Sequence, residues 1–146
     1  MIRGIHHTSL TVSDMARSIA FYGDMLGFQV LSDVIVQESP AHSVTQIPNA
    51  RLRIVHMQAY NSLVELIQYL SPIGRPHDRR TCDVGSAHIA FIVNDMEAAY
   101  QELKRKGVHF KSAPVVTGNA PDTIIKSVYF LDPDGITLEL VELGAP

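Results

Sequence analysis

Four residues that could bind a metal ion stand at matched places in two similar stretches of the sequence: His7, Glu65, His88 and Glu139. Each histidine opens a segment rich in residues typical of β-strands, and each glutamate lies at the centre of an apolar segment. Imidazole and carboxylate groups together suit divalent metals such as Zn, Ni, Co, Fe or Mn better than they suit Ca. We therefore predict one divalent metal in a site of two histidines and two glutamates.

An apolar strand is a costly place for an unpaired carboxylate, because the group loses its hydration on burial. Valine and leucine residues flank the two glutamates, and no Lys or Arg stands at an equivalent place in both stretches to neutralise them. Two neutral imidazoles, two carboxylates and one divalent cation have no net charge. A single histidine or glutamate in a strand is more often structural or solvated, as we expect for His6. Only the repeated pairing favours a metal site.

The two stretches belong to an internal repeat. Each copy places an aspartate 7 residues after its histidine and a glycine 19 or 20 residues after it, at Asp14 and Gly27 and at Asp95 and Gly107. The aspartates suit the N-cap of a helix, and the glycines suit the left-handed position that ends one. Each copy then ends in a strand centred on its glutamate. The shared order of these landmarks indicates two copies of one β-α-β-β-β unit.

The predicted elements follow the same order in both copies. In the first copy, strands are expected at about 5–12, 28–38, 51–58 and 62–69, with a helix after the first strand. In the second copy, strands are expected at about 88–93, 108–112, 124–131 and 136–142, with a loop at 113–123 and a turn at 132–135. The polar stretch 70–85, which contains two prolines, is the expected linker.

Together these elements predict an α+β fold. Two tandem βαβββ modules, about 5–69 and 86–143, would form a curved mixed sheet around the metal site within a single domain, 1–146. Because side chains alternate along a strand, the apolar residues of each sheet would pack on the helices. The four polar residues would then point to the opposite face.

The composition excludes several classes of function. The chain has 146 residues, and its 12 Lys and Arg against 15 Asp and Glu give a net charge of -3. This charge provides no basic field to attract nucleic acid or an anionic membrane. The sequence has no apolar run near the roughly 20 residues that span a bilayer, no signal-peptide pattern and one cysteine, Cys82. We expect a cytoplasmic protein.

These residues resemble the vicinal oxygen chelate superfamily. The resemblance rests on five stretches: His7–Asp14, Phe21–Tyr22, Leu26–Phe28, His88–Val93 and Phe130–Leu140. The superfamily includes glyoxalase I, methylmalonyl-CoA epimerase, extradiol dioxygenases, fosfomycin-resistance enzymes and bleomycin-binding proteins. Position by position, the resemblance implies that His7, Glu65, His88 and Glu139 are metal ligands. That set is similar to the site of glyoxalase I and close to that of the epimerase.

The chemistry that the resemblance implies is proton transfer next to a carbonyl, through a metal-bound enediolate, in a small substrate with two adjacent oxygens. Glu139 is the expected base, and Glu65 is the second candidate. One alternative is a non-haem iron dioxygenase of the extradiol type, which would need two histidines and one glutamate. Another is a protein that binds a small toxin or antibiotic and confers resistance. The resemblance also implies a homodimer, because modules in this superfamily pair within or between chains.

Overall fold

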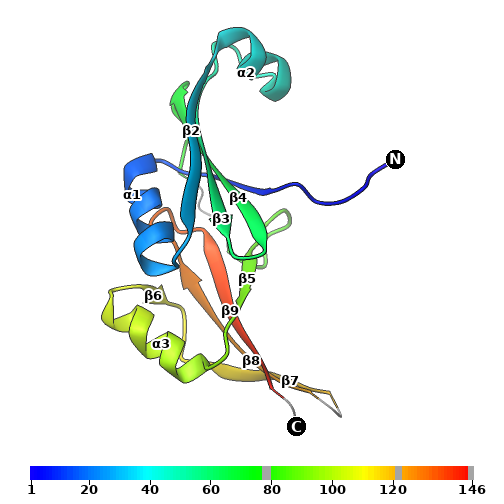
Figure 1. Ribbon diagram of the computed structural model, residues 1–146, viewed down its shortest axis with the longest axis vertical. Helices are drawn as coiled ribbons and strands as arrows, with labels where there is room; N and C mark the ends of the chain where they lie inside the picture. The colour runs from blue at the N-terminus through cyan, green and yellow to red at the C-terminus, as the bar shows by residue number, and fades with distance from the viewer. Residues whose placement is uncertain (77–79, 121–122, 145–146) are drawn as a thin grey trace. The chain divides into compact units, whose positions relative to one another are not determined.

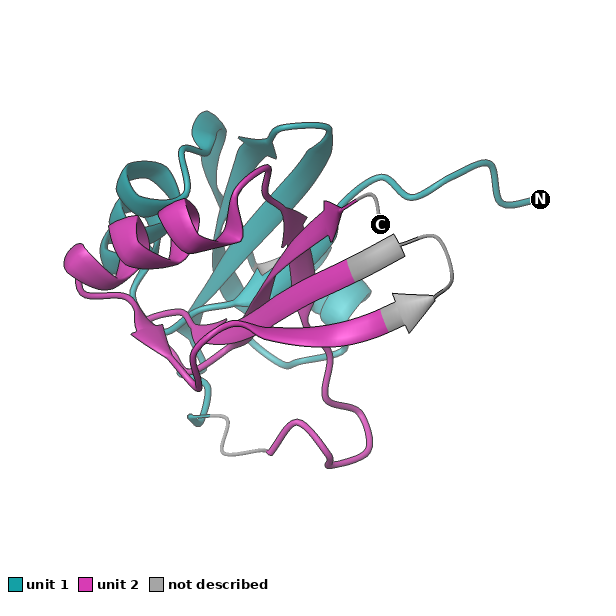
Figure 2. Ribbon diagram, turned by 90° about the horizontal axis from the view of Figure 1, so that it is seen from below, with its two compact units in different colours: residues 1–76 teal, residues 77–146 magenta. Residues whose placement is uncertain are grey.

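The matched landmarks of the sequence fold into two units, Met1–Pro76 and His77–Pro146 (Figure 2). The computed structural model describes residues 1–76, 80–120 and 123–144. The boundary between the units falls within the predicted linker 70–85, of which residues 77–79 lie outside the described part. No helix of the described residues is long and apolar enough to cross a membrane. The organisation as a single domain stays a prediction.

Unit 1 contains a mixed four-stranded sheet (Figure 1). Its elements are β1 (Thr8–Thr11), α1 (Met15–Ala20), the π-helical turn η1 (Phe21–Met25), β2 (Gln29–Gln37), α2 (Glu38–Thr45), β3 (Arg51–Ala59) and β4 (Ser62–Ser71). The strand order is β1-β4-β3-β2. β1 runs parallel to β4, whereas β3 is antiparallel to both β2 and β4.

Unit 2 repeats this topology in a five-stranded sheet. Its elements are β5 (Ile89–Ile92), α3 (Met96–Arg105), β6 (His109–Phe110), β7 (Val115–Ala120), β8 (Thr123–Leu131) and β9 (Thr137–Gly144). The order is β5-β9-β8-β6, and β7 pairs with β8. β5 is parallel to β9, as β1 is to β4. The two orders match when β6, β8 and β9 stand for β2, β3 and β4. The predicted α+β class and the repeated βαβββ pattern are confirmed.

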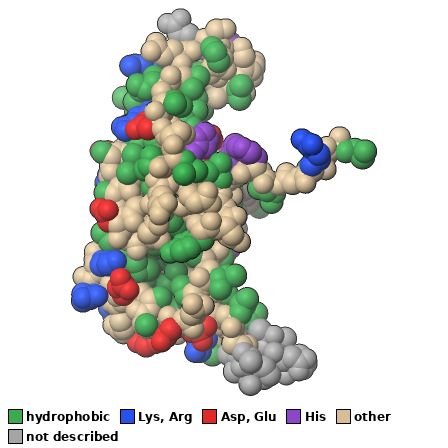
Figure 3. Space-filling view, viewed as in Figure 1, with side chains coloured by type: hydrophobic (Ala, Val, Ile, Leu, Met, Phe, Trp, Pro, Cys, Tyr) green, Lys and Arg blue, Asp and Glu red, His purple; other side chains and the backbone are tan. Residues whose placement is uncertain are grey.

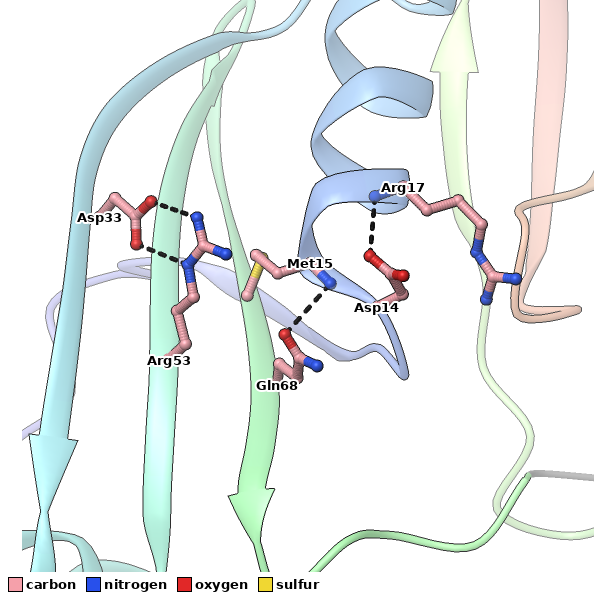
Figure 4. Close-up of polar contacts among 6 residues, drawn as sticks. All are labelled: Asp14, Met15, Arg17, Asp33, Arg53 and Gln68. Carbon is pink, nitrogen blue, oxygen red and sulfur yellow. Dashed lines mark hydrogen bonds and ion pairs between the residues drawn. The ribbon is translucent and has the colours of Figure 1, made fainter.

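The helical segment α1–η1 and helix α3 begin after the aspartates, and end before the glycines, that the sequence indicates. Asp14 accepts a hydrogen bond from the amide of Arg17 at 3.0 Å (Figure 4). Asp95 likewise accepts one, at 3.0 Å, from the amide three residues later. These bonds satisfy amides that have no partner within the first turn of a helix. Gly27 and Gly107 have φ values of 77° and 89°, the left-handed conformation that glycine adopts without a steric penalty.

A second polar contact holds the start of each helix against the last strand of its unit. In unit 1, the side-chain oxygen of Gln68 accepts a hydrogen bond from the amide of Met15 at 3.2 Å (Figure 4). In unit 2, Oε2 of Glu142 accepts one from the amide of Met96 at 2.6 Å. Oε1 of Glu142 also pairs with Lys126 at 2.7 Å. Gln68 lies three positions after Glu65, and Glu142 lies three positions after Glu139.

The core of each unit lies on the face of the sheet that packs against α1 or α3. In unit 1 this core includes residues with almost no exposed surface from α1, η1, β3 and β4: Met15, Tyr22, Val55, Met57 and Leu66. In unit 2 the corresponding residues are Met96, Phe130 and Leu138. The opposite face of each sheet is therefore available for polar groups.

An ion pair joins β2 to β3 in unit 1. Arg53 donates two hydrogen bonds to Asp33, one from Nε at 3.0 Å and one from a terminal nitrogen at 2.6 Å (Figure 4). The guanidinium holds the pKa of Asp33 below its ordinary value, because it bonds to the ionised carboxylate. The pair reinforces the contact between these two strands.

Helix α2 is absent from the sequence prediction, which proposes a strand to residue 38 and nothing further before 51. Pro40 stands in its first turn, where a helix amide has no partner in any case. Ala41 packs with Ala50 and Leu52 in an apolar cluster. Packing on this cluster, rather than a local helical pattern, accounts for α2.

The prediction of a loop at 113–123 is wrong, because β7 occupies residues 115–120 and pairs with β8. Proline, glycine and asparagine in this stretch favour a loop, but the β-branched residues at 115–117 suit a strand. The register shifts between Val116 and Gly118. A Cβ at Gly118 would lie 3.2 Å from the side chain of Ile125, so the close approach there favours glycine. Residues 121 and 122 lie outside the described residues.

Glu142 makes the stability of the protein dependent on pH in a defined direction. The side chain of Lys126 and the amide of Met96 hold the pKa of Glu142 below its ordinary value of 4.5, since both bond to the carboxylate. Its stabilising contribution is therefore fully present above pH 4.5 and is lost as the pH falls through the lowered pKa. We expect Glu142→Gln to lower the thermal midpoint by about 2–4 °C at neutral pH. The difference from the wild type should shrink in acid.

The measurement is thermal unfolding of both proteins, followed by circular dichroism, from about pH 3 to about pH 7. Glu142→Ala is the comparison variant, because alanine leaves the amide of Met96 without its acceptor. Glutamine keeps an acceptor there, as Gln68 does in unit 1. We expect Glu142→Ala to be less stable than Glu142→Gln at every pH. A gap between Glu142→Gln and the wild type that is the same at all pH values would contradict the assignment.

Candidate functional site

His7 and His88 each stand one residue before a strand. β1 begins at Thr8 and β5 begins at Ile89, so the strand predicted at 5–12 starts later than expected. The paired residues of the two parallel ladders start with Thr8 opposite Val64 and Ile89 opposite Leu138. Residues 5–7 precede Thr8, the first residue of β1 that is paired with β4, so they lie outside the strand. Both histidines remain next to the strand that carries a glutamate.

In unit 1 the structure brings His7 to Glu65. The register of β1 and β4 places Ser9 beside Glu65, and His7 lies two residues before Ser9. Nε2 of His7 is 3.4 Å from Oε1 of Glu65, and the glutamate side chain is 11% exposed. The neighbours Val64 and Leu66 are buried. The carboxylate therefore stands on the face of the sheet opposite the apolar core.

In unit 2 the structure brings His88 to Glu139 in the same way. Ala90 lies beside Glu139 in the register of β5 and β9, and His88 lies two residues before Ala90. Nε2 of His88 is 3.0 Å from Oε2 of Glu139, and the glutamate side chain is 14% exposed. Leu138 and Leu140, its neighbours, are buried. Each unit thus holds one histidine and one glutamate of the predicted set.

Two further histidines contact the site of unit 1. His56, on β3, has its Nε2 at 3.0 Å from Oε2 of Glu65. His6 has its Nδ1 at 2.8 Å from Nδ1 of His7. In the space-filling view, histidine side chains gather near the base of the N-terminal segment (Figure 3). His56 is a contact that the sequence analysis missed.

A signal for His56 is present in the sequence. The two-residue turn between β3 and β4 pairs Ala59 with Ser62, and counting back along both strands pairs His56 with Glu65. In unit 2 the matching position, opposite Glu139, holds Tyr129. Only unit 1 has a histidine at this position, so a comparison of the two copies does not single out His56.

Imidazole nitrogen and carboxylate oxygen, the donor types of the two pairs, are ones that first-row divalent metals bind. Two ligands at right angles on a metal, each about 2.1 Å from it, are about 3 Å apart. The nitrogen-to-oxygen distances of 3.4 Å in unit 1 and 3.0 Å in unit 2 are close to that separation. Within either unit, the described residues contain no group of three or more His, Cys, Asp or Glu arranged to hold a metal. Each unit by itself brings together two of the four residues of the predicted set.

The chain matches a known protein family. The family model described as Glyoxalase/Bleomycin resistance protein/Dioxygenase superfamily matches residues 4–140. This range includes both histidine–glutamate pairs.

Known proteins similar to this chain extend over nearly all of it. A 2-epi-5-epi-valiolone epimerase from Actinomyces sp is 30% identical, over 97% of this chain and 81% of the relative. A lactoylglutathione lyase from Salmonella typhimurium is 31% identical, over 93% of this chain and 90% of the relative. The crystal structure of a glyoxalase family protein from Bacillus cereus has a TM-score of 0.79 at 21% identity. It covers 98% of this chain and 95% of that one. This structural likeness shows a shared fold.

Proposed function

This chain belongs to the Glyoxalase/Bleomycin resistance protein/Dioxygenase superfamily, and from that premise we propose that it is a metal-dependent enzyme. The proposed reaction is proton transfer next to a carbonyl group, of the kind that a glyoxalase-type lyase, an isomerase or an epimerase performs. The observation that carries the proposal is the matched pair of a histidine and a nearly buried glutamate in each unit.

The proposed ligands are His7, Glu65, His88 and Glu139, and they would hold one Zn, Ni, Co, Fe or Mn ion. Each imidazole would bind through Nε2, the ring nitrogen that faces the glutamate in its unit. A bound divalent metal supplies Lewis-acid polarisation of a carbonyl oxygen. The burial of both carboxylates supports this assignment, because a nearby cation offsets their loss of hydration.

Glu139 is the proposed base. Its carboxylate would take a proton from the carbon next to the substrate carbonyl. It would then return the proton to a neighbouring atom, or a second acid would supply a proton to the opposite face of the same carbon while Glu139 passes its own proton to solvent. The first outcome is an isomerisation and the second an epimerisation, and neither needs an oxidant. Glu65 is the second candidate for this role.

The proposed substrate is a small molecule with two adjacent oxygens. The two relatives, a 2-epi-5-epi-valiolone epimerase and a lactoylglutathione lyase, suggest two substrates to test: 2-epi-5-epi-valiolone and a hemithioacetal of glutathione. A 2-methylacyl-CoA tests the epimerase that the sequence resembles. A cytoplasmic location stays part of the proposal, and it agrees with the single cysteine.

The first prediction concerns the metal itself. Protein treated with a chelator should bind one equivalent of a first-row divalent metal per complete set of four ligands. At a free metal concentration of 100 times Kd, binding should add about 2.7 kcal/mol to the free energy of unfolding. The measurement is thermal unfolding with and without each of the five metals, together with elemental analysis. If no metal raises the midpoint, the ligand assignment is wrong. His7→Ala and His88→Ala should each abolish the shift.

The second prediction concerns the base. Glu139→Gln keeps an oxygen that can bind a metal but lacks a basic site, so turnover per bound metal should fall by about 10²–10⁴-fold. Solvent deuterium should then no longer enter the position next to the carbonyl. Glu142→Gln is the matched control, because Glu142 contacts α3 on the other face of β9.

Wild-type exchange in Glu139→Gln would transfer the role of base to Glu65. The absence of exchange with every carbonyl substrate in the wild type would count against proton transfer. Consumption of dioxygen with a catechol would then favour the dioxygenase alternative.

The third prediction concerns assembly. We propose a homodimer, because modules of this superfamily pair within or between chains. Light scattering at micromolar concentration should give twice the chain mass of 16.1 kDa. A mass equal to one chain would rule out the homodimer and leave the ligand assignment intact.

A further inference from the structure

A row of four polar side chains crosses the sheet of unit 1. It contains Ser32 on β2, His56 on β3, Glu65 on β4 and His7 just before β1, in the order of the strands in the sheet. The registers place Ser32 opposite His56 and His56 opposite Glu65. Along the row, the distances are 2.9 Å from Oγ to Nδ1, 3.0 Å from Nε2 to Oε2 and 3.4 Å from Oε1 to Nε2.

The row gives the two oxygens of Glu65 to different histidines. Oε2 faces His56, and Oε1 faces His7. An ionised carboxylate accepts protons but donates none. A neutral His56 can therefore donate a hydrogen bond to Oε2 of Glu65 only when its ring proton is on Nε2. Its Nδ1 is then an acceptor for the hydroxyl of Ser32, with which it forms a hydrogen bond.

We propose that His56 is a positioning residue, which holds Oε2 of Glu65 and keeps Oε1 turned toward His7 and a bound metal. The inference rests on the proposed function, because it assigns Glu65 as a ligand. Groups that orient a ligand in this way typically change metal affinity by 10–100-fold. Ser32 holds His56 in turn, through its hydrogen bond with Nδ1.

Glu139 has different surroundings. The residue opposite it on β8 is Tyr129, whose ring centroid lies 5.1 Å from that of His88. Among the described residues, Glu139 has one histidine at ion-pair distance, whereas Glu65 has two. Glu65 is therefore restrained on both oxygens, as suits a permanent ligand. Glu139 is contacted by a histidine on one oxygen, Oε2, and this difference from Glu65 agrees with its proposed role as the base.

The test measures the affinity of the full-length, chelator-treated protein for Co²⁺ by competition with a chelator. His56→Leu should bind Co²⁺ about 10–100-fold more weakly, at unchanged stoichiometry, because Glu65 loses its restraint. His56→Gln should retain most of the affinity, since the glutamine amide can donate from nearly the same place. His109→Leu is the matched control, because it removes an exposed histidine on β6, and it should have no effect.

Two results with Co²⁺ would overturn the inference. Wild-type affinity in His56→Leu would show that Glu65 needs no restraint from His56. A loss as complete as that of His7→Ala, with no recovery in His56→Gln, would make His56 a ligand.

A measurement on the metal-free protein separates this inference from the proposed function. The ¹⁵N spectrum of the His56 ring should show Nε2 protonated and Nδ1 unprotonated, and both Ser32→Ala and Glu65→Gln should shift these signals. If the wild type binds no Co²⁺, the proposed function fails, and this spectrum alone decides the role of His56. Ring signals that neither substitution changes would refute the inference.

Discussion

The pairing of a nearly buried carboxylate with an imidazole, once in each unit, is the interaction on which the rest of the structure depends. Glu65 and Glu139 stand among apolar neighbours, where an isolated carboxylate would be strongly disfavoured. Each partner histidine comes from the segment just before a strand that runs parallel to the strand of the glutamate. An antiparallel strand would carry that segment to the other end of the sheet. The direction of β1 and β5 is therefore a requirement of the site.

β4 and β9 each make polar contacts with a histidine on one face and with the start of a helix on the other. Glu65 and Glu139 point to one face, while Gln68 and Glu142, three residues later, reach the start of a helix on the other. An odd separation along a strand places side chains on opposite faces. A slip of one residue in either ladder would turn the glutamates into the core and remove the contacts with the helices. The contacts on one face thus fix the register that the other face needs.

The parts of the fold and of the site that follow from local spacing could be predicted from the sequence. Asp14 and Asp95 mark the helix starts, and the repeat pairs each histidine with its glutamate. Elements that depend on distant contacts could not be predicted. α2 contains Pro40 and exists because Ala41 packs on an apolar cluster, and β7 contains Gly118 and exists because β8 pairs with it. His56 could not be predicted from the repeat, because the matching residue of unit 2 is Tyr129. The binding of a metal by these residues stays a prediction.

The two units anchor their helices with different chemistry. Gln68 meets α1 through a neutral amide, whereas Glu142 meets α3 through a carboxylate that also pairs with Lys126. Dissolved salt screens charges near the surface over about 8–10 Å at ionic strengths of about 0.1–0.15 M, and it leaves contacts between neutral groups nearly unchanged. Rising ionic strength would therefore weaken the anchor of α3 and spare that of α1. Two units of the same topology would differ in their tolerance of salt.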